Sequence, residues 1–291
     1  MKPEFESINC VCPIYAASDR GRANLIGTGT LLDFGKARFL VTAAHVEGER
    51  VENNVALYAG TSGPLVELPQ PFQSTVPPAP GNRRHDRLDF AFVRLSDPLA
   101  DRIARGRFFL PFTLIGVNDN IEPRAHYMFT GYMFTGFPAS REKTDYKNKK
   151  TKPSRFCFTG LTIPPNRMSA IGLHPEAHIA VEFNRDEVHD ASGNPGCFPC
   201  PSGMSGGAVW GGTGDFRRWF VQSAPQLVGI GIEHLQPHAA LVAVRIHLIL
   251  AAISKFHSDI APFVPKRQGF DNEITIVPWK PLSQTGGGKR G

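Results

Sequence analysis

Apolar runs in this chain are short, and glycines and prolines separate them. The chain contains 29 glycines and 25 prolines among its 291 residues. Glycines and prolines at this frequency favour many turns and short strands over long helices. Only residues 245–256, RIHLILAAISKF, combine helical spacing with the absence of both residue types. The pattern therefore predicts an all-β fold with one late helix, and a pair of β-barrels rather than alternating strand–helix units.

The expected strands follow from the individual runs. Residues 24–46 are expected to form two strands around the turn DFGKA at 33–37. A proline-rich stretch at 69–84 is expected to be a loop. Further strands are expected at 55–60, 87–95, 126–138 with its end at Gly136, 155–163, 178–184, 206–211 and 226–234.

Composition places the chain among cytoplasmic globular proteins. Apolar residues make up 41% and charged residues 20%, which is enough for a sizeable core. No segment has the length of a signal peptide core or a membrane span. The net charge of +6 is modest, and the lysine-rich run at 147–152 is more typical of a solvated loop than of a nucleic-acid site. Neither a membrane nor a nucleic acid is therefore expected as a partner.

One glycine-rich stretch, PSGMSGGAVWGG at 201–212, surrounds Ser205. Glycines at this density are costly in conformational entropy unless the backbone must approach something closely. The freedom of Gly203 to take positive φ would allow the N–H groups of Gly203 and Ser205 to form a concave anion site. This pattern indicates a nucleophile loop, and the alternative is a β-turn that carries an exposed serine.

A serine nucleophile needs a base and a group that orients the base. His45 is the candidate base, because it follows the small residues Thr42-Ala43-Ala44 at the end of an apolar strand. Asp89 is the candidate orienting acid, because apolar residues surround it and burial without a partner would be costly. Asp86 lies among charges in RRHDR and is expected to face solvent.

These three contexts together resemble the trypsin/chymotrypsin-like serine proteases in their bacterial, intracellular form. FLVTAAHV resembles the strand with the histidine of that family, LDFAFVRL the aspartate strand, and GMSGGAVWG the nucleophile loop, in the same chain order. The resemblance covers roughly residues 20–256. It implies two six-stranded antiparallel β-barrels with a C-terminal helix, divided into residues 1–138, 139–265 and a C-terminal extension at 266–291 with a partly disordered tail.

The same resemblance assigns a role to each candidate residue. His45 would be the general base, Asp89 its orienting acid and Ser205 the nucleophile. The N–H groups of Gly203 and Ser205 would form the oxyanion hole. The strand residues that contact substrate would be Gly231, Ile232 and Glu233, and no cofactor is implied.

Two departures from the family concern activation. Met204 occupies the position of the aspartate that pairs with a new N-terminus in zymogen-activated members, so activation by N-terminal cleavage is not expected. The disulfide cysteines that usually adjoin the histidine and the serine are also missing. Both departures fit a reducing compartment, where we expect narrow specificity or control by a regulatory protein partner or by a stress or defence signal.

The five cysteines leave three interpretations open. Cys10-x-Cys12 and Cys197-x-x-Cys200 have spacing that is typical of zinc ligands, but buried free thiols or a redox pair explain them as well. Free thiols are the simplest interpretation, so no metal site is predicted.

Specificity and catalytic competence are the remaining questions. No acidic residue falls at the base of the expected pocket, which favours small or apolar side chains before the scissile bond, although an inward Glu233 would favour a basic one. The leading hypothesis is an endopeptidase that acts on protein or peptide substrates. Its rival is a catalytically silent peptide-binding module on the same fold.

Overall fold

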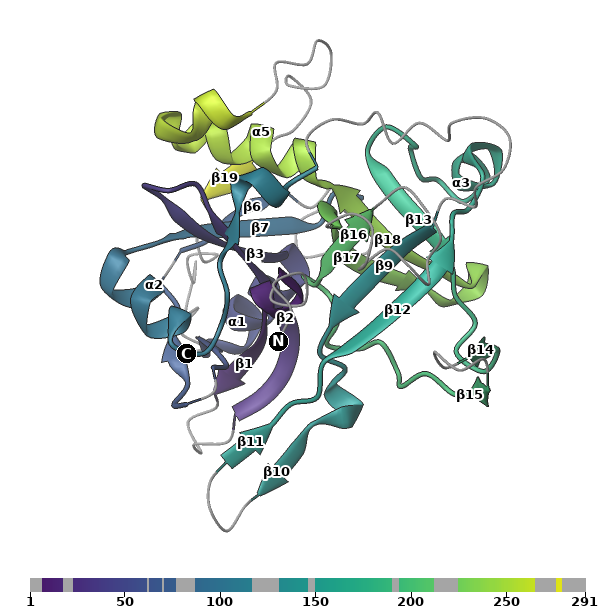
Figure 1. Cartoon of the computed structure of the whole chain (residues 1–291), viewed down its shortest axis with the longest axis horizontal. Helices are drawn as coiled ribbons and strands as arrows, with labels where there is room; N and C mark the ends of the chain where they lie inside the picture. Colours follow the sequence, from purple (N-terminus) through teal and green to yellow (C-terminus); the bar gives the residue numbers. More distant parts are fainter. Residues whose placement is uncertain are drawn as a thin grey trace, which may run out of the picture.

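The computed structural model describes residues 7–17, 23–61, 63–69, 71–76, 87–116, 131–145, 150–189, 194–211, 225–264 and 276–278. Two curled, mainly antiparallel sheets dominate this part of the chain, and a helix follows them near the C-terminus (Figure 1). The prediction of a mainly β chain with a helix near the C-terminus is confirmed, but the expectation of one helix is wrong, because the described part of the chain also contains three shorter, earlier helices.

The first sheet contains nine strands in the described part of the chain, in the order β19-β6-β7-β3-β2-β1-β4-β5, with β8 parallel to β2. The long strand β2 and its neighbour β3 form the expected hairpin around residues 34–37. Its strands are β1 (Val11–Ala17), β2 (Ala23–Asp33), β3 (Arg38–Ala43), β4 (Ala56–Ala59), β5 (Val66–Glu67), β6 (Gln73–Thr75), β7 (Phe90–Leu95), β8 (Leu110–Pro111) and β19 (Ile276–Pro278).

The second sheet has six strands in the order β12-β9-β16-β17-β18-β13. The sheet curls so far that its two edge strands approach each other. A bridge pairs Thr162 with Val181, and the N–H of Ile163 donates to the carbonyl of Ala180 at 2.9 Å. Its strands are β9 (Gly131–Gly136), β12 (Phe156–Leu161), β13 (His178–Glu182), β16 (Ala208–Gly211), β17 (Gln226–Leu235) and β18 (Ala240–Arg245).

Two small hairpins and four helices complete the described elements. The hairpins are β10 (Lys143–Asp145) with β11 (Lys150–Lys152), and β14 (Val188–His189) with β15 (Pro195–Gly196). The helices are α1 (Ala44–Asn53), α2 (Asp97–Ala104), α3 (Pro165–Ala170) and α5 (Ile246–Phe256), with short 3₁₀ turns between elements. Helix α5 matches the predicted helix at 245–256 almost residue for residue.

Helix α1 corrects one expectation directly relevant to the site. Residues 44–46 were expected to continue a strand, but the strand ends at Ala43 and His45 lies in the first helical turn. The helix is supported from within, because Arg50 donates two hydrogen bonds to the Glu47 carboxylate one turn earlier, at 2.8 and 2.6 Å. The apolar run FLVTAAHV concealed this boundary. Strand β6 likewise lies within the stretch at 69–84 that was expected to be loop.

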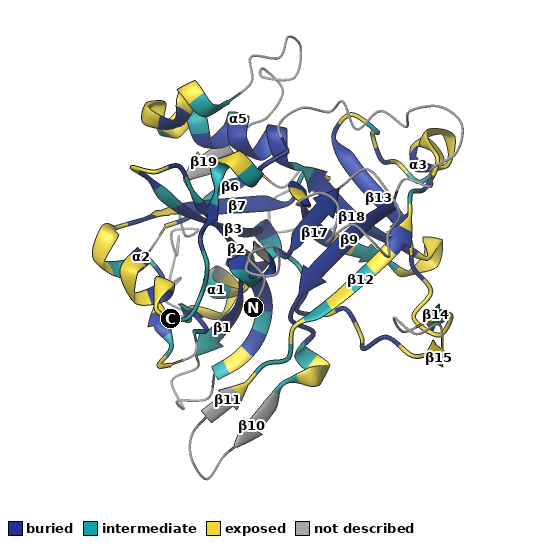
Figure 2. Cartoon of the chain, in the orientation of Figure 1, coloured by how far each residue is buried: buried dark blue, intermediate teal, exposed yellow. Residues whose placement is uncertain are grey.

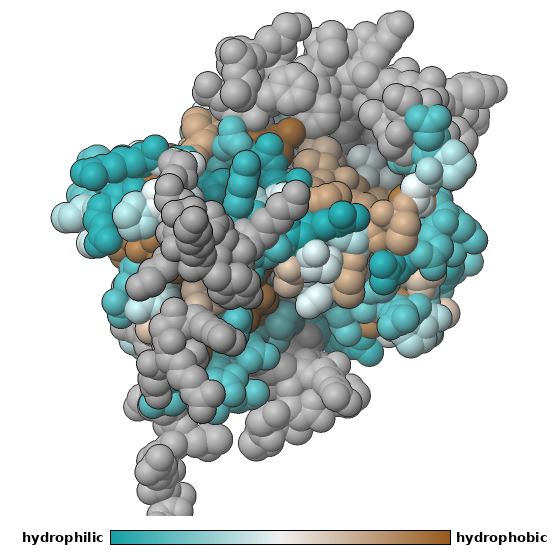
Figure 3. Space-filling view, turned by 90° about the horizontal axis from the view of Figure 1, so that it is seen from below, coloured by the Kyte–Doolittle hydropathy of each residue, from teal (hydrophilic) through white to brown (hydrophobic). Residues whose placement is uncertain are grey.

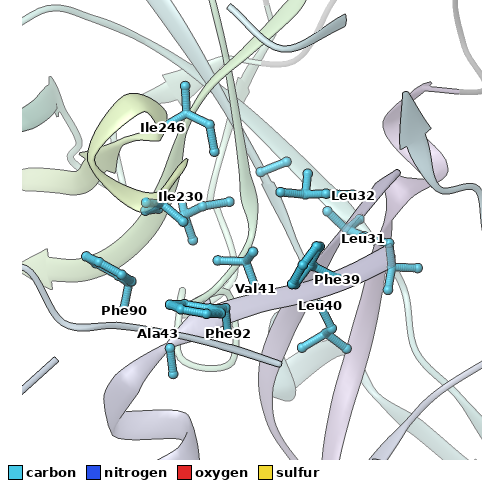
Figure 4. Packing of buried hydrophobic residues seen from close by; sticks show 14 of the residues in the cluster. Leu31, Leu32, Phe39, Leu40, Val41, Ala43, Phe90, Phe92, Ile230 and Ile246 are labelled. Atoms are coloured by element: carbon cyan, nitrogen blue, oxygen red, sulfur yellow. The ribbon is translucent and has the colours of Figure 1, made fainter. Parts of the chain in front are cut away.

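One hydrophobic cluster joins the two sheets. Side chains of β3 and β7, such as Val41 and Phe92, meet Ile230 of β17 and Ile246 of α5 (Figure 4). Figure 2 shows that buried residues are continuous through the central strands and along the inner side of α5. This shared core fixes the first sheet against β17, which is the arrangement that brings the candidate site residues together.

The surface in the described part of the chain is mostly hydrophilic, with apolar residues exposed in a central band on one face (Figure 3). Large apolar side chains that remain exposed include Leu161 and Phe256. Within the described ranges, no helix is long and apolar enough to cross a membrane.

Candidate active site

His45 and Asp89 form a closely bonded pair between α1 and the start of β7. The Nδ1 atom of His45 lies 2.6 Å from Oδ2 of Asp89, and the backbone N–H of His45 donates to Oδ1 at 2.9 Å. The Asp89 side chain is only 9% exposed, whereas that of His45 is 40% exposed. The carboxylate therefore acts from the protein interior on an imidazole that is partly exposed to solvent. The Oδ1 atom of Asp89 also accepts a hydrogen bond from an N–H group in the first turn of α1, where a negative charge is favourable.

Asp89 has a strained backbone. Its φ of 32° lies in the left-handed region that non-glycine residues rarely adopt, although aspartate tolerates it better than most. The backbone N–H of Ala44 donates to the Asp89 carbonyl at 2.9 Å, which adds a third bond between Asp89 and the 44–45 segment. Two bonds therefore hold the carboxylate, and a third holds the backbone carbonyl of the same residue. Strain that is retained by over-determined contacts is characteristic of functional sites.

The loop around Ser205 requires its glycines. Gly203 and Gly206 both have φ of 90°. A Cβ on Gly206 would lie 1.9 Å from the carbonyl oxygen of Thr28, and one on Gly207 would lie 2.1 Å from that of Thr135. The loop around Ser205 therefore lies so close to backbone of both sheets that a side chain at Gly206 or Gly207 would clash with it. This geometry favours the nucleophile-loop interpretation over an ordinary exposed turn.

Strand β2 of the first sheet holds this loop through hydrogen bonds. The backbone N–H of Thr28 donates to the carbonyl of Ser205 at 2.8 Å, and the Thr28 hydroxyl donates to the carbonyl of Gly203 at 2.8 Å. The same hydroxyl accepts the N–H of Phe137 at 3.0 Å. Thr30 adds a hydroxyl bond to the carbonyl of Gly206 at 2.9 Å. These partners turn the loop carbonyls toward β2.

The N–H groups of Gly203 and Ser205 remain available. Neither donates a hydrogen bond to another residue in the described part of the chain, whereas the N–H of Met204 between them donates to the carbonyl of Pro201 at 2.9 Å. Two unpaired backbone donors, one of which belongs to the serine itself, can bind an oxygen with developing negative charge.

A pocket of about 280 Å³ opens beside the serine, and both His45 and Ser205 line it. Its walls come from the nucleophile loop, from β9 and from the adjoining strands β17 and β18. Most of the lining is apolar, with a few polar groups, as is usual for small ligand sites. The remaining lining residues are Phe134, Thr135, Cys200, Pro201, Ser202, Met204, Gly207, Gly231, Ile232, Glu233, His234, Leu241 and Val242.

Two neighbouring residues of β17 give the pocket walls different electrostatic character. Partial burial raises the pKa of the Glu233 carboxyl, and the nearby Asp89 raises it as well. Arg87 and His45 lower the same pKa, but the net shift is upward. Partial burial also lowers the pKa of His234, and Arg185 lowers it further. Because successive strand residues point to opposite sides, Glu233 interacts with the Asp89 region and His234 with the region of Arg185.

The cysteines occupy two different environments. Cys10 and Cys12 are fully buried, and burial raises the pKa of both thiols, that of Cys12 to about 11. Cys197 and Cys200 are exposed, and all five cysteines are free thiols. Among the described residues, no three histidine, cysteine, aspartate or glutamate side chains lie close enough together to hold a metal ion.

The structure brings together most of the residues that the sequence indicated. His45, Ser205 and the strand residues Gly231, Ile232 and Glu233 line one pocket, and Asp89 lies directly behind His45. Asp86 and residues 147–149 of the lysine-rich run lie outside the described residues, whereas residues 150–152 form β11.

Sequence reasoning missed two residues of the site, Thr28 and His234. The hydroxyl of Thr28 has no local signal, because its partner Gly203 is 175 residues away. His234 directly follows Glu233 in a strand that was assigned to the site, and strand alternation alone would have pointed it to a different side from Glu233.

Comparisons with known proteins add no assignment. No family model matches the chain, and no curated protein matches its sequence.

Proposed function

We propose that this protein is a serine endopeptidase that hydrolyses peptide bonds in protein substrates through an acyl-enzyme. The observation that carries the proposal is the 2.6 Å contact between His45 Nδ1 and Asp89 Oδ2, made by a histidine that shares a pocket with Ser205. The unpaired N–H groups of Gly203 and Ser205 provide the further component that acyl transfer requires.

The proposed reaction begins with attack by Ser205 Oγ on the carbonyl carbon of the scissile bond. His45 Nε2 accepts the serine proton, and Asp89 stabilises the resulting imidazolium through Nδ1. The carbonyl oxygen becomes negative and accepts hydrogen bonds from Gly203 and Ser205. When the tetrahedral intermediate collapses, the imidazolium protonates the leaving amine and the acyl-enzyme remains.

Hydrolysis of the acyl-enzyme reverses these roles. A water molecule attacks the ester carbonyl and gives a proton to His45. The second tetrahedral intermediate then expels Ser205, which recovers its proton from the imidazolium, and the carboxylic acid product leaves. These steps need no cofactor.

Three further proposals concern the context of this activity. The fold supports an arrangement of two trypsin-like barrels, because the edges of the second sheet meet at the Thr162 bridge. Five free thiols support a cytoplasmic location. Met204 is buried beside Ser205, which supports a site that is permanently formed or controlled by a partner protein.

Labelling with a fluorophosphonate probe tests the nucleophile. Wild-type protein should be labelled at Ser205 and should cleave a casein substrate, whereas Ser205→Ala should do neither while it keeps the wild-type circular dichroism spectrum. The exposed Ser202→Ala variant, three residues away, is the matched control and should still be labelled. Absence of labelling in a folded wild-type protein would favour the rival, a silent peptide-binding module. Cleavage by Ser205→Ala at the wild-type rate would show that another residue is the nucleophile.

A further inference from the structure

The polar side chains of the pocket differ in whether they already have partners. Thr135 is occupied, because its hydroxyl accepts the indole N–H of Trp210 at 3.1 Å and contacts Cys157. By contrast, the ring nitrogens of His234 make no hydrogen bond to another residue within the described ranges. His234 lines the pocket, and its ring therefore has hydrogen-bonding atoms that are not already used within the protein.

Packing fixes the His234 ring in place. Its centroid lies 5.1 Å from that of Phe183, and the two rings are nearly perpendicular at 88°. His234 pairs in register with Leu241 of β18, so the two side chains share one face of the sheet. Leu241 and Phe183 both belong to a second, smaller hydrophobic cluster, which also contains Phe134 and Phe198. The imidazole is therefore a polar group that packs against apolar and aromatic side chains.

The chemistry of this ring limits what it can bind. Burial and Arg185 both lower the pKa of His234, so the ring is neutral near pH 7 and offers one N–H donor and one nitrogen acceptor. A carboxamide also carries both a donor and an acceptor, whereas an aliphatic side chain carries neither. A carboxylate carries only acceptors, so it can use the N–H donor of the ring but not its acceptor nitrogen.

From this match we propose that the pocket selects a side chain that ends in a carboxamide, glutamine or asparagine, immediately before the scissile bond, and that His234 is the residue that recognises the carboxamide. This inference rests on the proposed protease function, since a carbonyl held by Gly203 and Ser205 places the side chain of the same residue in the adjoining pocket. It replaces the expectation of a small or apolar side chain, which the apolar walls alone would favour.

A set of peptides that differ only at that position tests the proposal. Wild-type protein should cleave the glutamine peptide with a kcat/KM at least about tenfold higher than the leucine or glutamate peptides. His234→Phe keeps a ring against Phe183 but removes both hydrogen-bonding atoms. It should lower the ratio of kcat/KM for the glutamine peptide to kcat/KM for the leucine peptide about tenfold per hydrogen bond lost.

The matched control is His238→Phe, since His238 is an exposed histidine of the same segment that does not line the pocket. It should keep the glutamine preference. A wild-type preference for leucine would overturn the proposal, and so would an unchanged glutamine preference in His234→Phe. A preference for glutamate would also overturn it and would indicate that Arg185 attracts an anion.

A binding measurement separates this proposal from the proposed activity. Calorimetry on Ser205→Ala, with short peptides that end in glutamine or leucine, needs no catalysis. Tighter binding of the glutamine peptide that is lost in the His234→Phe double variant supports the pocket assignment even if the wild-type protein neither cleaves nor is labelled. Equal binding of the two peptides contradicts it even if the protein is an active protease.

Discussion

Substitution of Thr28 tests how strongly the first sheet holds the nucleophile loop. Thr28→Val removes the hydroxyl with little change in shape. Two buried groups would lose their partner, the carbonyl of Gly203 and the N–H of Phe137. A buried polar group without a partner costs about 1–3 kcal/mol. The free energy of unfolding should therefore fall by about 2–6 kcal/mol, a large part of the roughly 5–15 kcal/mol that is typical of a folded protein.

Two variants of the same strand serve as controls. Thr28→Ser keeps the hydroxyl and removes one buried methyl group, so it should cost about 1 kcal/mol. Thr30→Val removes a single hydrogen bond, to Gly206, and should cost about 1–3 kcal/mol. Urea unfolding followed by circular dichroism measures all three, with an unchanged denaturant slope as the sign that only stability has changed.

Fluorophosphonate labelling of the same variants tests whether the hydrogen bond from Thr28 to Gly203 also affects the candidate site. Because the Thr28 hydroxyl orients the carbonyl of Gly203, its loss should also slow fluorophosphonate labelling in protein that remains folded. Thr28→Ser should be labelled at nearly the wild-type rate. The reasoning is refuted if Thr28→Val is as stable as Thr28→Ser, or if both are labelled equally fast.

Three further changes have expected outcomes. Asp89→Asn should lower kcat roughly 10⁴-fold without unfolding the protein, because asparagine tolerates the same backbone conformation but favours the wrong imidazole tautomer; kinetics with circular dichroism would measure both effects. Gly206→Ala should lower the melting temperature far more than Gly35→Ala, since both have positive φ at a cost of about 1–2 kcal/mol but only the first would clash with backbone. In native protein at pH 8, mass mapping should find Cys200 modified by a maleimide and Cys12 unmodified, because burial raises the pKa of the Cys12 thiol to about 11 and the thiolate is the reactive form.

Local patterns in the sequence predicted many of the strands, although not β1, β6 or β18, and they singled out the candidate triad. Glycine density marked the Ser205 loop, and apolar flanks distinguished Asp89 from Asp86. The same patterns failed where the decisive contact is distant. Helix α1 begins at Ala44 because Asp89, from another element, binds the N–H groups of its first turn, and no feature of residues 38–46 records that contact.

The site also depends on properties that residue patterns do not carry. The strain at Asp89 is visible only in its backbone dihedral angle. The role of Thr28 depends on a pairing with a residue far along the chain, and that of His234 depends on which strand face turns toward the pocket. Tertiary packing sets each of these, so the fold had to be known first.

The hydrogen bonds between β2 and the Ser205 loop have a consequence for biosynthesis. The N-terminal half of the chain supplies His45, Asp89 and the threonines that hold the loop, whereas Ser205 leaves the ribosome more than a hundred residues after Asp89. A nascent or truncated chain therefore contains the base without the nucleophile. Under the proposed function, proteolytic capacity arises only when synthesis has passed Ser205 and the second sheet has docked on the first. Under the same proposal, a chain whose second sheet has not yet formed cannot cleave its neighbours.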